Sequence, residues 1–245
     1  MIGIVDSGLG GVATCFHLRK KHPRTSFLVL ADQKNAPYGD KTKEELLEIA
    51  RDNIRWFYDQ GIREVIIACN TLCSTVYPEL VEEFPDMKLW NIIDLELENL
   101  RHKRFRSVLI MATSATIRMK RYEDGIRKLF PKRTVYAKAT PKLVPMIEGG
   151  ENPFTIRDVL ADYLAPYRDK ADAVLLGCTH YPLVSAQIHE VLPARQFDPN
   201  EGIEKAVSFP EEENPVLRIY TSHDAENLEK AIRLLFGEEC EVEER

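Results

Sequence analysis

Seven short apolar runs recur along the chain and constrain its fold more than any other feature. Most are four or five residues long and almost wholly apolar, which is typical of strands buried on both faces of a parallel sheet. Segments with helical periodicity separate them, and alternation of strands with helices predicts an α/β fold with mostly parallel sheets. The runs are Ile2–Val5, Phe27–Leu30, Val65–Ala68, Val108–Met111, Val135–Ala137, Val174–Leu176 and Val216–Tyr220.

Helix signals occur in three of the segments between these runs and in the segment after the last run. Thr42 and Glu45 form a capping box, and Gly61 ends the apolar stripe that follows it. Asn152 precedes Pro153, which predicts an N-cap followed by proline at the first helical position. Two further apolar stripes predict helices over residues 119–130 and 228–235.

Charge and composition exclude several classes of protein. The 33 Lys and Arg against 39 Asp and Glu give a net charge of −6, so we expect no nucleic-acid partner. No run of about 18 apolar residues occurs, so we expect no membrane span, and no basic region precedes the first apolar run, so we expect no signal peptide. The odd number of cysteines and their wide spacing favour a reducing cytoplasm over a disulfide framework. The five cysteines are Cys15, Cys69, Cys73, Cys178 and Cys240.

An internal similarity links two segments of the chain. Residues 64–71 and 173–180 each run from a buried strand through a small residue and a cysteine to polar groups. A strand that enters a polar turn precedes each segment, and the spacing from Asp6 to Cys69 is 63 residues, against 65 from Thr113 to Cys178. We therefore predict two pseudo-equivalent α/β halves.

Cys69 and Cys178 are placed where chemistry is expected in such a fold. Both follow strands, at the carboxyl ends where ligands gather in open α/β sheets. Each also precedes a predicted helix, whose N-terminus stabilises a thiolate. If the halves face each other, one thiolate can remove a proton from a carbon and the other thiol can return one from the far side. That pattern indicates inversion at a carbon atom, although two core cysteines remain the simpler interpretation.

Neutral polar groups surround both cysteines in the predicted turns. Hydroxyls, amides and backbone N–H groups at helix starts suit a carboxylate ligand. Asp6 and His180 are candidates to assist a cysteine, and Glu148 is a carboxylate beside a glycine turn; taken singly, each also fits an ordinary structural role. The polar residues of the turns are Asp6, Ser7, Asn70, Thr71, Thr113, Thr116, Thr179 and His180.

Other chemistries fit the motifs less well. Cys69, Cys73, Cys178 and His180 offer four zinc ligands, but their spacing matches no common zinc signature. A Cys178–His180 hydrolase needs two residues on one loop to act as nucleophile and base. The glycines at 8–11 lack the G-x-G-x-x-G pattern of a dinucleotide loop, and nothing marks a lysine for pyridoxal phosphate.

Six motifs in order along the chain identify a family. With them, the chain resembles the cofactor-independent glutamate racemases of the aspartate/glutamate racemase superfamily. The motifs are residues 6–11 (DSGLGG), Ala31-Asp32 with Pro37-Tyr38-Gly39, residues 68–71 (ACNT), Thr113 and Thr116 with Tyr122, residues 144–148 (VPMIE), and residues 177–182 (GCTHYP).

The resemblance implies interconversion of L- and D-glutamate, without pyridoxal phosphate or a metal, to supply D-glutamate for peptidoglycan and so for cell shape. It implies that Cys69 is the base for the D-enantiomer and Cys178 the base for the L-enantiomer. The implied assisting catalytic residues are Asp6, Asp32, Glu148 and His180. The implied substrate contacts are Asp6, Ser7, Pro37, Tyr38, Gly39, Asn70, Thr71, Thr113, Thr116, Thr179 and His180.

The resemblance also implies two α/β domains with the active site in the cleft between them. We expect residues 1–93 plus 208–245 to form the first and residues 94–207 to form the inserted second, in a cytoplasmic homodimer. Ala112, Leu72-Cys73 and residues 197–200 depart from the family pattern but remove no proposed catalytic group. A racemase of aspartate or another acidic amino acid, and a non-catalytic amino-acid-binding relative, remain alternatives.

Overall fold

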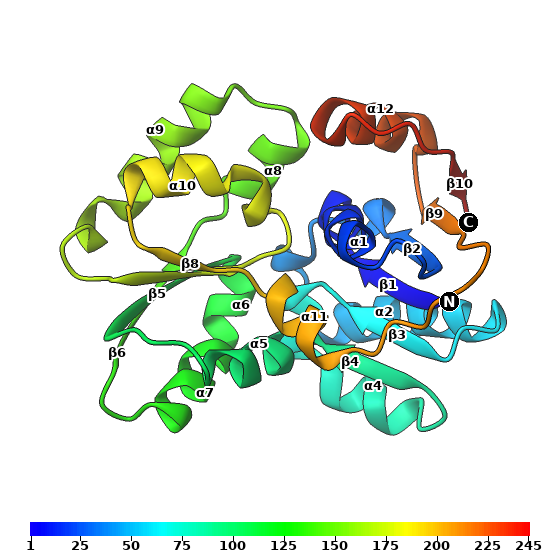
Figure 1. Cartoon of the computed structure of the whole chain (residues 1–245), viewed down its shortest axis with the longest axis horizontal. Helices are drawn as coiled ribbons and strands as arrows, with labels where there is room; N and C mark the ends of the chain where they lie inside the picture. The colour runs from blue at the N-terminus through cyan, green and yellow to red at the C-terminus, as the bar shows by residue number, and fades with distance from the viewer.

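Two parallel sheets organise the computed structural model, which describes residues 1–245 (Figure 1). The strands are β1 (Ile2–Asp6), β2 (Phe27–Ala31), β3 (Glu64–Ile67), β4 (Lys88–Asn91), β5 (Ser107–Ala112), β6 (Thr134–Ala139), β7 (Ala173–Gly177), β8 (Arg195–Phe197), β9 (Leu217–Thr221) and β10 (Val242–Glu244). The first sheet has the order β10-β9-β2-β1-β3-β4, and the second has the order β6-β5-β7-β8. All neighbouring strands pair in parallel, so the predicted α/β class is confirmed.

The strand order of the second sheet repeats four strands of the first. The order β2-β1-β3-β4 corresponds to β6-β5-β7-β8, as the internal similarity predicted, and β9 and β10 extend the first sheet alone. In each set, chain connections leave the central pair in opposite directions. The carboxyl ends of β1 and β3, and of β5 and β7, are therefore switch points, where open α/β sheets hold ligands.

Each of the seven apolar runs lies within a strand or extends past it by one residue, whereas β4, β8 and β10 have no such run. These three lie at sheet edges, and each has at least one exposed residue. An edge strand is only partly covered, so it does not need the continuous apolar sequence that predicts a central parallel strand; the edge strand β6 nevertheless contains the run Val135–Ala137.

Helices cover both faces of the two sheets, with α9 and α10 on one face of the second sheet and α6 and α7 on the other (Figure 1). The α-helices are α1 (Leu9–Lys21), α2 (Lys43–Asp59), α3 (Asn70–Thr75), α4 (Tyr77–Glu83), α5 (Ile92–Leu100), α6 (Ser114–Met119), α7 (Arg121–Leu129), α8 (Leu143–Glu148), α9 (Pro153–Leu164), α10 (Ser185–Val191), α11 (Asn200–Ala206) and α12 (Ala225–Phe236). Short 3-10 helices are η1 (Gln33–Asn35), η2 (Tyr38–Asp40), η3 (Ala165–Tyr167) and η4 (Tyr181–Val184). No helix combines the length and the apolar character needed to cross a membrane.

Both predicted caps are formed, and the helix predicted over residues 119–130 corresponds to α7, which begins two residues later. The Thr42–Glu45 capping box is formed, with Glu45 N donating to Thr42 Oγ1 at 3.2 Å. Asn152 caps α9 by accepting a hydrogen bond from Phe154 N at 2.8 Å. The stripe predicted over residues 119–130 is broken, because Lys120 has a φ of 55° and separates α6 from α7. Left-handed backbone at a residue other than glycine ends a helix.

Two apolar clusters fill the interior, and β5 contributes to both. Val108 and Ile110 belong to the larger cluster of 48 buried residues, which also contains the core of the first sheet. Leu109 and Met111 point to the other face, in a cluster of 17 buried residues under α9 and α10. The alternating faces of this strand thus join the second sheet to the core of the first.

Glu96 on α5 is a fully buried carboxyl group near α11. Its pKa is raised from 4.5 to about 8, chiefly by burial. The nearby carboxylates of Glu201 and Asp198 act in the same direction, whereas a hydrogen bond from Asn99 Nδ2 to Glu96 Oε2 at 2.9 Å opposes the shift. The carboxyl group is therefore largely protonated at neutral pH in the folded protein.

We expect the free energy of unfolding to fall as the pH rises from about 4.5 to about 8. The folded state binds the Glu96 proton more tightly than the unfolded chain does. The free energy of unfolding is therefore highest below pH 4.5 and falls by on the order of 2–4 kcal/mol as the pH rises to about 8. Glu96→Gln removes this part of the pH dependence. Urea unfolding at the two ends of the range measures it, and equal dependence in both proteins contradicts the assignment.

Candidate active site

A cavity of about 340 Å³ lies at the carboxyl ends of strands from both sheets. Its walls come from the residues that follow β1, β3, β5, β6 and β7, together with the segment around η2 and helix α8. The lining residues are Asp6, Ser7, Ala36, Pro37, Tyr38, Gly39, Asp40, Cys69, Asn70, Thr71, Thr113, Ser114, Thr140, Pro141, Val144, Pro145, Glu148, Cys178, Thr179 and His180. The switch points of the two sheets therefore contribute to a single site.

Of the fifteen predicted site residues, only Asp32 and Thr116 do not line this cavity. Thr140 lines it but was not predicted, although it directly follows β6 and the rule on strand ends applies to it. Its hydroxyl is hydrogen-bonded to Tyr181 OH at 2.5 Å. The sequence therefore predicted most of the wall. The lining residues that it missed are Ala36, Asp40, Ser114, Thr140, Pro141, Val144 and Pro145.

Cys69 lies in the cavity wall at the N-cap position of α3, with 5% of its surface exposed. Burial raises the pKa of its thiol well above 9.0, and the Asp6 carboxylate raises it further, against the Leu72 backbone N–H, which lowers it. The start of α3 does favour the thiolate through the Leu72 N–H, but burial and the Asp6 carboxylate outweigh this contribution. Cys178 also raises this pKa, so the two thiols interact electrostatically.

Cys178 begins a chain of polar contacts that passes through His180 to Glu148. Cys178 Sγ lies 3.6 Å from His180 Nδ1, and His180 Nε2 lies 2.8 Å from Glu148 Oε1. Cys178 is followed by the 3-10 helix η4 rather than directly by an α-helix, so the predicted helix start behind it is absent. The polar group that contacts the Cys178 thiol is instead the imidazole of His180.

His180 and Glu148 each shift the pKa of the other toward its charged form. Burial disfavours the imidazolium, but hydrogen bonds to Cys178 and Glu148 outweigh it and raise the pKa of His180 well above 6.5. Burial also disfavours the Glu148 carboxylate, but His180 and the Leu9 backbone N–H lower its pKa below 4.5. At neutral pH the pair is therefore an imidazolium and a carboxylate, with the imidazolium next to Cys178.

Asp6 ends β1 and is held at the start of α1. Its Oδ2 accepts hydrogen bonds from Gly11 N at 3.0 Å, Gly8 N at 3.3 Å and Thr179 Oγ1 at 3.5 Å. A Cβ at Gly10 would lie 2.0 Å from Thr179 Oγ1. The glycines thus allow the residues after β7 to approach α1 closely. This close packing accounts for the glycines at residues 8–11 without a bound dinucleotide.

Neutral donors line the same cavity as the two cysteines. Tyr122 OH donates to Asn70 Oδ1 at 2.8 Å, while the buried Asn70 Nδ2 has no hydrogen-bond partner. Thr71 Oγ1 lies 3.1 Å from Thr113 Oγ1. Thr116 supports this wall from behind, since its hydroxyl accepts a hydrogen bond from Thr113 Oγ1 at 3.0 Å. An unpartnered buried amide is costly unless a ligand such as a carboxylate accepts its hydrogen bond.

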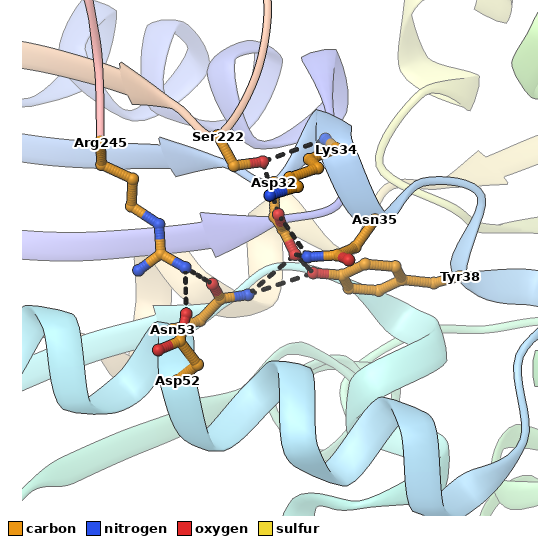
Figure 2. Close-up of polar contacts among 8 residues, drawn as sticks. All are labelled: Asp32, Lys34, Asn35, Tyr38, Asp52, Asn53, Ser222 and Arg245. Carbon is orange, nitrogen blue, oxygen red and sulfur yellow. Dashed lines mark hydrogen bonds and ion pairs between the residues drawn. The ribbon is translucent and has the colours of Figure 1, made fainter.

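Asp32 lies behind the cavity wall, where its two carboxylate oxygens are occupied by protein donors (Figure 2). Tyr38 OH and Ser222 Oγ each donate to it at 2.6 Å. Asn35 Nδ2 donates to both oxygens at 3.0 Å. Asp32 therefore reaches the cavity through Tyr38, and its geometry fits a positioning residue better than a group that touches substrate.

The proposed zinc ligands do not assemble. Cys73 is fully buried, does not line the cavity, and donates through Sγ to Ile67 O at 3.1 Å. No three His, Cys, Asp or Glu side chains are grouped as metal ligands. Cys69, Cys73, Cys178 and His180 therefore do not come together as the four ligands that the spacing offered.

Comparisons with known proteins agree on one family. Residues 24–203 match the model of the Asp/Glu/hydantoin racemase family. A glutamate racemase of Aquifex aeolicus is 31% identical over 245 residues, which cover 98% of this chain and 95% of that protein. The structure of glutamate racemase from Francisella tularensis in complex with D-glutamate superposes with a TM-score of 0.87 at 25% identity, covering 99% of this chain and 95% of that one. Glutamate racemase from Thermus thermophilus, in complex with beta-chloro-D-alanine, gives 0.84 at 28% identity, covering 100% and 95%.

Proposed function

The chain belongs to the Asp/Glu/hydantoin racemase family, and from this membership we propose that it interconverts L- and D-glutamate by proton transfer between Cys69, the substrate Cα and Cys178. The enzyme is then an isomerase, a racemase that needs no cofactor. The observation that carries the proposal is the pair of cysteines in one cavity, each following the equivalent strand of its own sheet. The relatives that are named glutamate racemase support the choice of substrate.

In the proposed reaction, the Cys69 thiolate removes the Cα proton of D-glutamate, and the Cys178 thiol gives a proton to the opposite face. Conversion of L-glutamate runs the same steps in reverse. After each turnover one thiol has gained a proton and the other has lost one, so solvent must restore the starting protonation states. Asp6 lies beside Cys69, and the His180–Glu148 pair supports Cys178, so each thiol has its own polar partner.

The difficult step is loss of a weakly acidic Cα proton to a thiolate. Preorganised donors that bind the substrate carboxylate stabilise the charge that develops at Cα. Asn70 Nδ2 and the hydroxyls of Thr71 and Thr113 can supply such donors. When the two α/β domains close around the substrate, water is excluded from the cavity and these interactions become stronger.

We expect a solution of D-glutamate to lose its circular dichroism signal when the purified protein is added. In D₂O, each L-glutamate formed carries deuterium at Cα, because the proton that is returned comes from an exchangeable thiol. Aspartate at the same concentration tests the alternative substrate, and we expect its signal to decay at least about tenfold more slowly. Faster decay with aspartate would reassign the substrate, and a constant signal with both would favour a non-catalytic binding protein.

The same proposal includes a physiological role and an assembly. We propose that the protein supplies D-glutamate for peptidoglycan in the cytoplasm, as a homodimer of chains in which residues 94–207 form an inserted domain. Five free cysteines support a reducing compartment. Growth of a D-glutamate-requiring bacterial strain without supplement, after expression of this chain, tests the role, and light scattering of the purified protein tests the dimer.

A further inference from the structure

Arg245, which follows β10, contacts the helix behind the substrate cavity (Figure 2). Its Nη2 donates to Asp52 Oδ2 at 2.6 Å and to Asn53 Oδ1 at 2.7 Å, both on α2. Only 13% of the Arg245 side chain is exposed, and its guanidinium lies 5.6 Å from the centre of the Trp56 ring. The side chain is therefore held in one place rather than extended into solvent.

The contact with Arg245 fixes the orientation of the Asn53 side-chain amide. With Oδ1 facing the guanidinium, Nδ2 faces the other way and donates to Tyr38 OH at 3.1 Å and to Asp32 Oδ2 at 3.3 Å. A flipped amide would place its NH₂ against the guanidinium and its oxygen against the Asp32 carboxylate, losing every one of these bonds. Since Asn53 is 1% exposed, water does not replace them.

The Asn53 amide and the Asp32 carboxylate together fix the Tyr38 hydroxyl. This hydroxyl accepts from Asn53 and donates to Asp32 Oδ2 at 2.6 Å, so both of its roles are assigned. Tyr38 is buried and lines the cavity between Pro37 and Gly39. Arg118 Nη2, from α6 beside the second sheet, donates to Gly39 O at 3.4 Å, so the same wall contacts the other lobe.

The segment after β9 reaches the same carboxylate from a second side. Ser222 Oγ donates to Asp32 Oδ1, and Arg245 N donates to Thr221 O at 3.0 Å. Residues 221–245 therefore contact both the Asp32 carboxylate and the Asn53 amide that orient Tyr38. Loss of the Arg245 guanidinium would free the amide while leaving the serine contact in place.

We propose that Arg245 and Asn53 are positioning residues for the racemase: they orient the Tyr38 hydroxyl and so hold the Pro37–Gly39 wall against the substrate. This inference rests on the proposed function. It assigns no chemical step to Arg245, which does not line the cavity. The expected consequence of losing it is weaker binding of substrate and transition state alike.

Arg245→Met tests the inference, since it keeps an apolar stem over Trp56 and removes the donor. We expect the KM for both enantiomers to rise about five- to tenfold, the effect of one hydrogen bond to a buried group, with kcat within about twofold of wild type. Arg245→Lys should restore the KM to within about twofold, because both contacts come from one nitrogen and an ammonium group has three donors. The control Asp52→Ala removes the exposed partner, keeps the Asn53 contact, and should leave the KM unchanged.

A double-mutant cycle separates positioning from a general loss of structure. Tyr38→Phe removes the hydroxyl through which Arg245 is proposed to act, so Arg245→Met should raise the KM no further in that background. Additive effects of the two substitutions would overturn the inference, as would a KM increase in Asp52→Ala equal to that in Arg245→Met.

Hydrogen–deuterium exchange gives a readout that does not depend on turnover. Arg245→Met should speed amide exchange in residues 33–42 roughly fivefold, while Arg245→Lys should not. A wild-type protein that leaves glutamate unchanged would refute the proposed function and not this contact network. Exchange in residues 33–42 that is the same in wild type and Arg245→Met would refute the network.

Discussion

Cys69→Ala and Cys178→Ala are each expected to lower kcat/KM for glutamate racemisation by about 10⁴-fold, because each removes the acid or base that acts on one face of Cα. The loss should be equal in the two directions. The enantiomers have equal free energies, so a catalyst cannot change their equilibrium ratio and must change both values of kcat/KM by the same factor. Circular dichroism started from each pure enantiomer measures both rates, and near-normal racemisation by either variant would refute a mechanism with two bases.

Solvent exchange distinguishes the cysteines that remain. In Cys178→Ala, Cys69 can remove the proton of D-glutamate and return a deuteron to the same face, so deuterium should enter D-glutamate without inversion. Cys69→Ala should label L-glutamate in the same way. Proton NMR in D₂O follows the Cα signal of each enantiomer. The matched control is Cys73→Ala, which removes a nearby buried thiol outside the cavity and should keep kcat/KM within about threefold of wild type.

Glu148→Gln is expected to lower kcat/KM by about 10²-fold at pH 8 and by about tenfold at pH 6. The Glu148 carboxylate is one of the groups that raise the pKa of His180 well above 6.5, so its removal lowers that pKa. The imidazolium that faces Cys178 is then lost at a lower pH, and activity that needs it falls earlier as the pH rises. The measurement is kcat/KM across pH 5.5–9.5.

The shape of this profile is the critical result. A variant profile that is lower than wild type at every pH but has the same alkaline limb would mean that Glu148 does not act through the charge of His180. Glu151→Gln provides the matched control, because Glu151 is an exposed carboxylate three residues further along the chain. It should leave both the rate and the profile unchanged.

Much of the site was predictable because its signals are local. A buried strand followed by a small residue, a cysteine and polar groups places each thiol at a strand end, and two such segments predict facing halves. The Thr42 and Asn152 caps were predictable for the same reason. Arg245 and Asn53 are 192 residues apart and share no periodic pattern, so no sequence signal connects them.

Burial was the other quantity that local patterns missed. The start of α3 suggests a lowered pKa and a thiolate at Cys69, but burial and the Asp6 carboxylate raise the pKa instead. Asp32 matched a family motif, yet its oxygens bind Tyr38 and Ser222 instead of facing the cavity. Both outcomes depend on which segments meet in three dimensions, which a motif does not specify.

The repeated strand order of the two sheets has a consequence for how the enzyme can be tuned. In the proposed mechanism, each enantiomer gives its Cα proton to the cysteine of one sheet, and the two sheets share a strand order but differ in the residues that contact that cysteine. Substitutions around one sheet can therefore alter how long a given enantiomer stays bound and how quickly it is converted. They cannot change the equilibrium ratio of the two enantiomers, so one enantiomer can be obtained in excess only if a later, irreversible reaction removes it.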